Sequence, residues 1–147
     1  MKAINLLLKI LLVTILLVFV FLKILDPYTL VIKLNWNIEF PKGYRKIYEK
    51  ETEVSFGGDG ERYHILEYKN TKKITELERD MVWQTEKDLK LEKHIIEILE
   101  NLDVPIKYWP SFDRQYDFFV KENERDKRSN ITILKFDNRI YVIEDIY

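Results

Sequence analysis

An apolar run at the amino terminus constrains this chain more than any other feature. Residues 3–25 are almost wholly apolar, and Thr14 is the single polar residue between positions 10 and 22. In a helix that rises ~1.5 Å per residue, this run spans roughly 34 Å, enough to cross a hydrocarbon core of about 30 Å. Lys9 and Lys23 flank the most apolar part, where long side chains reach the headgroups. The run predicts a transmembrane anchor over residues 1–25.

A cleavable signal peptide is the alternative to an anchor, but it ends at a small-residue cleavage site. Residues 23–28 are Lys, Ile, Leu, Asp, Pro and Tyr, which favours the anchor. Lys2, Lys9 and the α-amino group outweigh Lys23 and Lys33 on the other side. Because the side richer in Lys and Arg faces the cytoplasm, we predict a single-pass protein of the cell membrane. Its N-terminus is cytoplasmic, and residues 26–147 form one extracytoplasmic domain.

Charge and cysteine content narrow the function of that domain. The chain has 24 basic and 25 acidic residues and no cysteine. Residues 1–25 hold three of the basic residues and none of the acidic ones, which leaves a charge of −4 on the rest. A nucleic-acid-binding domain needs a basic face, so we expect no nucleic-acid partner. Disulfides and thiol chemistry are excluded, and no cofactor is expected.

Apolar periodicity predicts an α+β fold. Strict alternation over residues 31–40 predicts a strand, and residues 44–55 and 62–68 read as two more. Asn70 or Thr71 is expected to cap a first helix, and residues 88–101 carry the apolar stripe of a second one. Residues 115–121, 131–136 and 139–146 read as strands. The predicted order is β-β-β-α-α-β-β-β, an antiparallel sheet with both helices on one face.

A glycine-rich segment is the most unusual local feature: Gly57, Gly58, Asp59, Gly60 and Glu61. Three glycines in four residues predict positive φ angles in a hairpin turn. The functional alternative is a site in which backbone amides hold an anion, or Asp59 and Glu61 bind a hard cation. The segment lacks the acidic ladder of an EF-hand and the Gly-Lys-Ser/Thr ending of a phosphate loop, which favours the turn.

The chain has two histidines, His64 and His94. Two histidines and a carboxylate can bind zinc, but a separation of 30 residues fixes no such geometry. We predict no metal site and interpret both side chains as structural.

Aromatic residues gather between the second helix and the next strand, at Tyr108, Trp109 and Phe112. Because loops often carry binding residues and aromatic side chains are enriched in interface hot spots, this segment is the predicted contact patch for a protein partner at the cell surface. The alternative is that Trp109 and Phe112 fold back over the helix end and close the core.

The stretch from Ser55 to Tyr63 resembles a motif in small, uncharacterised membrane-anchored proteins of Gram-positive bacteria. These proteins similarly combine an N-terminal apolar segment, a Gly-Asp-Gly turn before an aromatic strand, and a helical middle. In that family a histidine commonly precedes the aspartate, whereas Gly58 precedes Asp59 here. The resemblance implies a location and a fold but no activity.

These observations predict a membrane-tethered, non-enzymatic binding module. The alternative is a metal- or anion-dependent enzyme that uses the turn from Gly57 to Glu61 together with His64.

Overall fold

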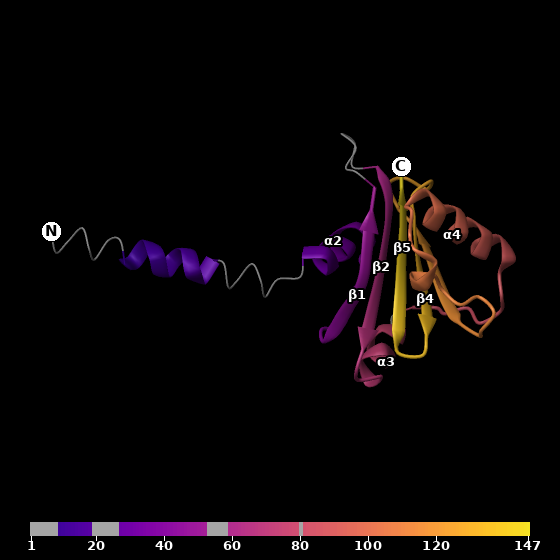
Figure 1. Cartoon of the computed structure of the whole chain (residues 1–147), viewed down its shortest axis with the longest axis horizontal. Helices are drawn as coiled ribbons and strands as arrows, with labels where there is room; N and C mark the ends of the chain where they lie inside the picture. Colours follow the sequence, from indigo (N-terminus) through magenta and orange to yellow (C-terminus); the bar gives the residue numbers. More distant parts are fainter. Residues whose placement is uncertain (1–8, 19–26, 53–58, 80) are drawn as a thin grey trace. The chain divides into compact units, whose positions relative to one another are not determined.

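A five-stranded antiparallel sheet is the framework of this α+β protein (Figure 1). The computed structural model describes residues 9–18, 27–52, 59–79 and 81–147. The chain divides into two units, Met1–Glu39 and Phe40–Tyr147, and the sheet belongs to the second. Its strands lie in the order β1-β2-β5-β4-β3, and each pairs antiparallel with its neighbour.

The elements of the second unit follow the chain from one hairpin, through the helices, to a three-stranded meander. They are β1 (Tyr44–Glu51), β2 (Gly60–Tyr68), α3 (Lys72–Glu78), α4 (Leu89–Asn101), the 3-10 turn η1 (Ile106–Tyr108), β3 (Asp117–Glu122), β4 (Asn130–Phe136) and β5 (Arg139–Ile146). The β1–β2 hairpin, the helix α4 and the last three strands confirm the corresponding predictions.

The helix α4 forms where the sequence predicts it because its first turn is capped and one of its faces is apolar. The Asp88 carboxylate accepts hydrogen bonds from the backbone N–H groups of Lys90 and Leu91, which would otherwise lack partners at a helix start. At the other end of the helix, Leu102 is the C-cap residue, and its backbone N–H donates a hydrogen bond to the Ile98 carbonyl. Capping and packing therefore act on the same thirteen-residue helix.

The main core lies between α4 and one face of the sheet, named here the α4 face. Side chains alternate along each strand, so this face carries every second residue of β2, β4 and β5. The core cluster is Tyr63, Ile65, Ile95, Ile98, Leu99, Leu102, Val104, Tyr116, Phe118, Leu134, Phe136, Tyr141 and Ile143. In Figure 1, α4 lies along the β4 and β5 side of the sheet.

The two helices do not share one face, which corrects the prediction. Lys135 alternates with the core residue Leu134, so it lies on the opposite face, where Glu78 of α3 and Asp117 form ion pairs with it. Trp83, which follows α3, has its ring 6.4 Å from that of Phe119 on the same opposite face. The chain between β2 and β3 thus contacts both faces of the sheet.

The predicted transmembrane helix over residues 1–25 is wrong. The structure describes residues 9–18 of the apolar run as helical. Among the residues described, none of the helices combines the length and the apolar composition needed to cross a bilayer. Residues 1–8 and 19–26, which the prediction also concerned, lie outside the described parts of the chain. The extracytoplasmic location of the domain stays a prediction.

The predicted strand over residues 31–40 is also wrong, so among the described residues the sheet has five strands and not six. The helix α2 (Pro27–Trp36) takes its place. Of the alternating apolar residues, Ile32 and Trp36 are buried while Leu34 is 75% exposed. Spacing of four places the buried pair on one helical face. Asn37 then ends the helix at φ 52°, donating its N–H to the Lys33 carbonyl.

We predict that Leu99→Ala destabilises the protein by about 3 kcal/mol, because it removes a fully buried side chain and leaves a cavity. Leu89→Ala is the matched control in the same helix, since Leu89 is 74% exposed. Urea denaturation of both full-length variants measures the difference. Equal losses would contradict the assignment of the apolar stripe to the core.

Candidate functional site

The aromatic segment, residues 106–112, lies against the core and remains partly exposed. Tyr108, Trp109 and Phe112 pack on the core cluster as partly buried side chains. The alternative in which Trp109 and Phe112 fold back over the helix end therefore describes their packing. Ile106, a residue that the sequence pattern does not single out, is 80% exposed. The sequence offers no signal for it, because its exposure depends on how the following aromatic rings pack on the core.

Side-chain hydrogen bonds to backbone carbonyls hold the aromatic segment at several points. The Tyr63 hydroxyl donates to the Tyr108 carbonyl at 2.6 Å. The Trp109 indole N–H donates to the Val104 carbonyl at 2.8 Å, which satisfies the polar atom of a half-buried ring. Near the far end, the Lys87 ammonium donates to the Phe112 carbonyl. The segment is thus fixed to the sheet, to the end of α4 and to its start.

The glycine-rich segment is described only from Asp59 onward, since Gly57 and Gly58 lie outside the described residues. Asp59 is exposed, and Gly60 begins β2 with φ at +146°, as predicted for a glycine of this turn. Thr52 closes the hairpin: its hydroxyl accepts the Glu61 N–H at 3.1 Å. These contacts are those of a hairpin end.

The structure does not bring His64 together with Glu61. Residues three apart in one strand point to opposite faces, and Glu61 contacts α4 whereas His64 lies on the far face. Burial lowers the pKa of His64 to about 3, with further lowering by the positive charges of Lys46 and Arg62. Across the described parts of the chain, no three His, Asp or Glu side chains are grouped to hold a metal ion.

A cluster that the sequence pattern does not reveal forms where β2 and β5 meet α4. We name Glu61, His94, Asn101 and Asp145 the acid–histidine cluster. Glu61 and Asp145 are direct partners on adjacent strands. The His94 Nε2 lies 3.3 Å from an Asp145 carboxylate oxygen, and the Asn101 amide donates to Glu61 at 2.9 Å. His94 and Asn101 are seven residues apart, two helical turns on one side of α4.

Burial changes the acidity of both carboxyl groups in this cluster. Desolvation raises the pKa of Asp145, and the nearby His94 opposes that rise. Desolvation also raises the pKa of Glu61; the Asn101 hydrogen bond lowers it, the Asp145 charge raises it and His94 lowers it. The folded protein thus holds two partly desolvated acids beside each other.

One sequence signal could have found this cluster. Glu144 and Asp145 are adjacent inside the apolar strand β5, so alternation must direct one carboxyl to each face. Both are buried: Glu144 lies 3.8 Å from an Arg62 nitrogen on the far face, and Asp145 meets His94 on the α4 face. Buried acids need polar partners, so such a pair in a core strand predicts two polar contacts.

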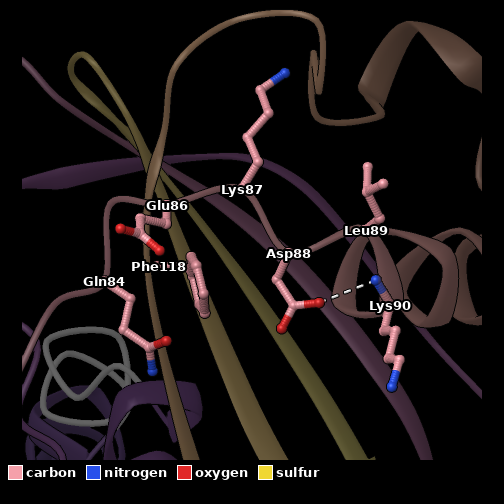
Figure 2. A pocket seen from close by; sticks show the side chains of 7 residues that line it. All are labelled: Gln84, Glu86, Lys87, Asp88, Leu89, Lys90 and Phe118. Atoms are coloured by element: carbon pink, nitrogen blue, oxygen red, sulfur yellow. Dashed lines mark hydrogen bonds between the residues drawn. The ribbon is translucent and has the colours of Figure 1, made fainter.

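A hollow of about 400 Å³ opens beside Phe118 at the start of α4 (Figure 2). The chain approaches it through Gln84, which pairs with Phe118 as an isolated antiparallel bridge. Asp88 borders the hollow, but its carboxylate is engaged in capping α4, as the dashed line to Lys90 in Figure 2 shows. Gln84, Phe118 and Asp88, three of the residues that line the hollow, therefore already have structural roles.

In comparisons with family models, with curated proteins and with solved structures, none matched this chain. The resemblance to small membrane-anchored proteins of Gram-positive bacteria stays a prediction.

We predict that His64 makes the protein less stable in acid. Above pH about 6.5 the imidazole is neutral in both states. Below this pH the unfolded chain takes up a proton that the folded chain refuses until about pH 3. The contribution of His64 to stability therefore falls as the pH falls through this window, by about 2 kcal/mol at pH 5. Urea denaturation between pH 7 and pH 4 measures the slope, which His64→Gln should reduce.

His94→Gln is the control for that experiment, because the His94 side chain is 42% exposed. It should keep most of the acid-induced loss. If His64→Gln keeps the wild-type slope, burial of the His64 ring does not control the acid sensitivity.

We predict that Gly60→Ala destabilises the protein by about 1–3 kcal/mol, because a side chain at positive φ is strained. The added Cβ would also meet the Thr52 hydroxyl oxygen at 2.0 Å, and moving that oxygen breaks its bond with Glu61. Gly43→Ala is the control: φ is +101° there, but a Cβ meets nothing within 4 Å. Urea midpoints should rank Gly60→Ala as the more damaging change, and the reverse order would contradict the close approach of Thr52.

Proposed function

We propose that this protein is a non-enzymatic binding module that contacts a protein partner through the aromatic segment. One observation carries the proposal: Ile106 is 80% exposed beside aromatic residues that the core and the hydrogen bonds hold in place. Binding residues are commonly found on loops positioned by a rigid scaffold. The segment is such a loop, supported by the α4 face of the sheet.

The fixed conformation of the segment favours binding. A flexible loop loses conformational freedom when it binds, and that loss reduces the affinity. Here the Tyr108 ring stacks on Tyr48 with centroids 4.1 Å apart, and Trp109 is held by its indole hydrogen bond. Most of the ordering therefore occurs during folding, and a partner that covers Ile106 gains apolar burial with little further ordering.

The chemistry around Ile106 suggests what the partner presents. The Lys107 ammonium lies over the Tyr108 ring, 4.9 Å from its centroid, so a positive charge borders the exposed apolar side chain. A complementary surface would combine an apolar pocket for Ile106 with an acidic group at its rim. Charge at a rim contributes to association rate and specificity more than to affinity, so the apolar contact is expected to dominate the binding energy.

Photocrosslinking tests this proposal. A photoreactive residue replaces Ile106 in the full-length chain, and in a second protein it replaces Val82, which is 84% exposed and lies outside the segment. In the cells that make the protein, we expect a discrete crosslinked partner from position 106 and none from position 82. Identical adducts from both positions, or no adduct from either, would contradict a partner at this surface.

Affinity is then measured directly with the purified crosslinked partner. Ile106→Asp should weaken binding at least about tenfold, the loss expected when an interface anchor is removed. Val82→Asp should bind as the wild type does. Both residues are exposed, so their substitution should change the free energy of unfolding by less than about 0.5 kcal/mol. Unchanged affinity of Ile106→Asp would rule out the aromatic segment as the contact.

A further inference from the structure

The acid–histidine cluster joins α4 to the sheet through groups whose charge changes with pH. Glu61 comes from β2, Asp145 from β5, and His94 and Asn101 from α4. The contacts between helix and strands are the 3.3 Å approach of His94 to Asp145 and the 2.9 Å hydrogen bond of Asn101 to Glu61. The α4 contact also includes a 2.7 Å hydrogen bond from the Tyr116 hydroxyl to the Glu92 carboxylate, whereas the core cluster that α4 packs on is mainly apolar.

The cluster is not arranged for greatest stability at neutral pH. Like charges directly opposite on neighbouring strands destabilise a sheet, and Glu61 and Asp145 are such a pair. Asp145 is only 6% exposed, so its carboxylate is also removed from most of its water. Each carboxylate is matched by one neighbouring side chain, His94 or Asn101, and Asn101 carries no charge.

We propose that the acid–histidine cluster is a pH-sensitive latch that holds α4 on the sheet more firmly in mildly acidic solution than at neutral pH. Protonation of one carboxyl removes the repulsion between the two acids and turns an acceptor into a hydrogen-bond donor. It also removes the cost of keeping that charge away from water. The His94 contact weakens in exchange, but this side chain is 42% exposed and its contact is partly screened.

The sign of the effect is set by the two carboxyl groups. A pKa raised on folding means that the folded state binds the proton more tightly than the unfolded state does. Desolvation raises both pKa values, that of Glu61 and that of Asp145. Stabilisation by protonation is therefore complete below the unfolded pKa values and is lost as the pH rises through the folded ones.

Within the part of the chain that the structure describes, few other charges could reverse this sign. The charges that act on Glu61 are Asp145 and His94, and the charge that acts on Asp145 is His94. The residue opposite Asp145 on β4 is the uncharged Asn130. On the outer side of α4, Lys93 and Glu97 are exposed and lie 3.7 Å apart as an ion pair of their own.

The latch also affects the segment that comes after α4 in the chain. Leu102 and Val104 continue from the last turn into the core, and the aromatic segment begins two residues later. Tighter docking of the C-terminal half of α4 therefore holds the start of that segment more firmly. This coupling is present whether or not the segment binds a partner.

Hydrogen exchange of the full-length protein tests the latch. The amide protection of Ile98 and Leu99, corrected for intrinsic exchange, is compared at pH 5 and pH 7 in the wild type and in Glu61→Gln/Asp145→Asn. We expect the ratio of wild-type to variant protection to rise at least about threefold from pH 7 to pH 5, because the folded wild type binds the proton more tightly than the unfolded chain does. The effect of His64 is present in both proteins and cancels in the ratio.

Glu97→Gln/Glu100→Gln is the matched control, because it removes two exposed acids from the same helix. Its ratio to the wild type should not change with pH. A constant ratio for the cluster variant, or a ratio that falls in acid, would overturn the latch.

A second measurement needs no variant. Carbon-detected NMR titration of the wild type should give midpoints for the Glu61 and Asp145 carboxyls above the ordinary values of exposed acids, about 4.3 for Glu and about 3.9 for Asp. Midpoints equal to those of the exposed acids would also overturn the proposal.

Discussion

A continuous arc of aromatic rings on the α4 face is the interaction on which the rest of the domain depends. Neighbouring rings have centroids between 4.1 and 6.4 Å apart, and the arc starts and ends in the same connecting segment: Phe112, Tyr116, Phe136, Tyr141, Tyr63, Tyr48 and Tyr108. Aromatic pairs contribute about 0.5–1.5 kcal/mol each beyond their burial. The arc crosses four strands, so it joins the edge hairpin to the meander. Because it closes on the aromatic segment, the core that stabilises the sheet also positions the proposed contact surface.

The two edge strands of the sheet carry features that discourage pairing with a strand of another chain. The strand β1 is an edge with five charged residues, and its register with β2 shifts between Lys46 and Tyr48. Charges and bulges on an edge strand discourage pairing with another chain. At the other edge, Gln84 exchanges both backbone hydrogen bonds with Phe118. A partner is therefore expected to meet side chains, Ile106 foremost, and not an open strand edge.

The sequence predicts correctly those elements whose capping residues and apolar periodicity agree with their burial in the fold. It fails where the periodicity fits more than one element. Over residues 89–101 the cap at Asp88 and the apolar stripe both indicate a helix, so the sequence predicts this element correctly. Over residues 31–40 the alternation is equally clear, yet Ile32 and Trp36 satisfy helical spacing as well. A short apolar run cannot distinguish a strand from a helix.

For the candidate site, the sequence shows that aromatic residues gather in the segment 106–112. The exposure of Ile106, however, depends on how the following rings fold back. The acid–histidine cluster depends on register: only the pairing of β2 with β5 places Glu61 opposite Asp145.

The alternation of β2 also separates two opposing responses to pH. On the far face, His64 is held neutral by burial, so acid weakens the fold there. On the α4 face, Glu61 and Asp145 are held where protonation is favoured, so acid strengthens the docking of α4. The two effects act on the same strands and oppose each other in mild acid. Global stability therefore reports only their difference, and a flat pH profile would conceal a change in which parts of the molecule are held most firmly. Residue-level exchange separates the two effects because the acid–histidine cluster acts on the amides of α4, whereas His64 lies in β2.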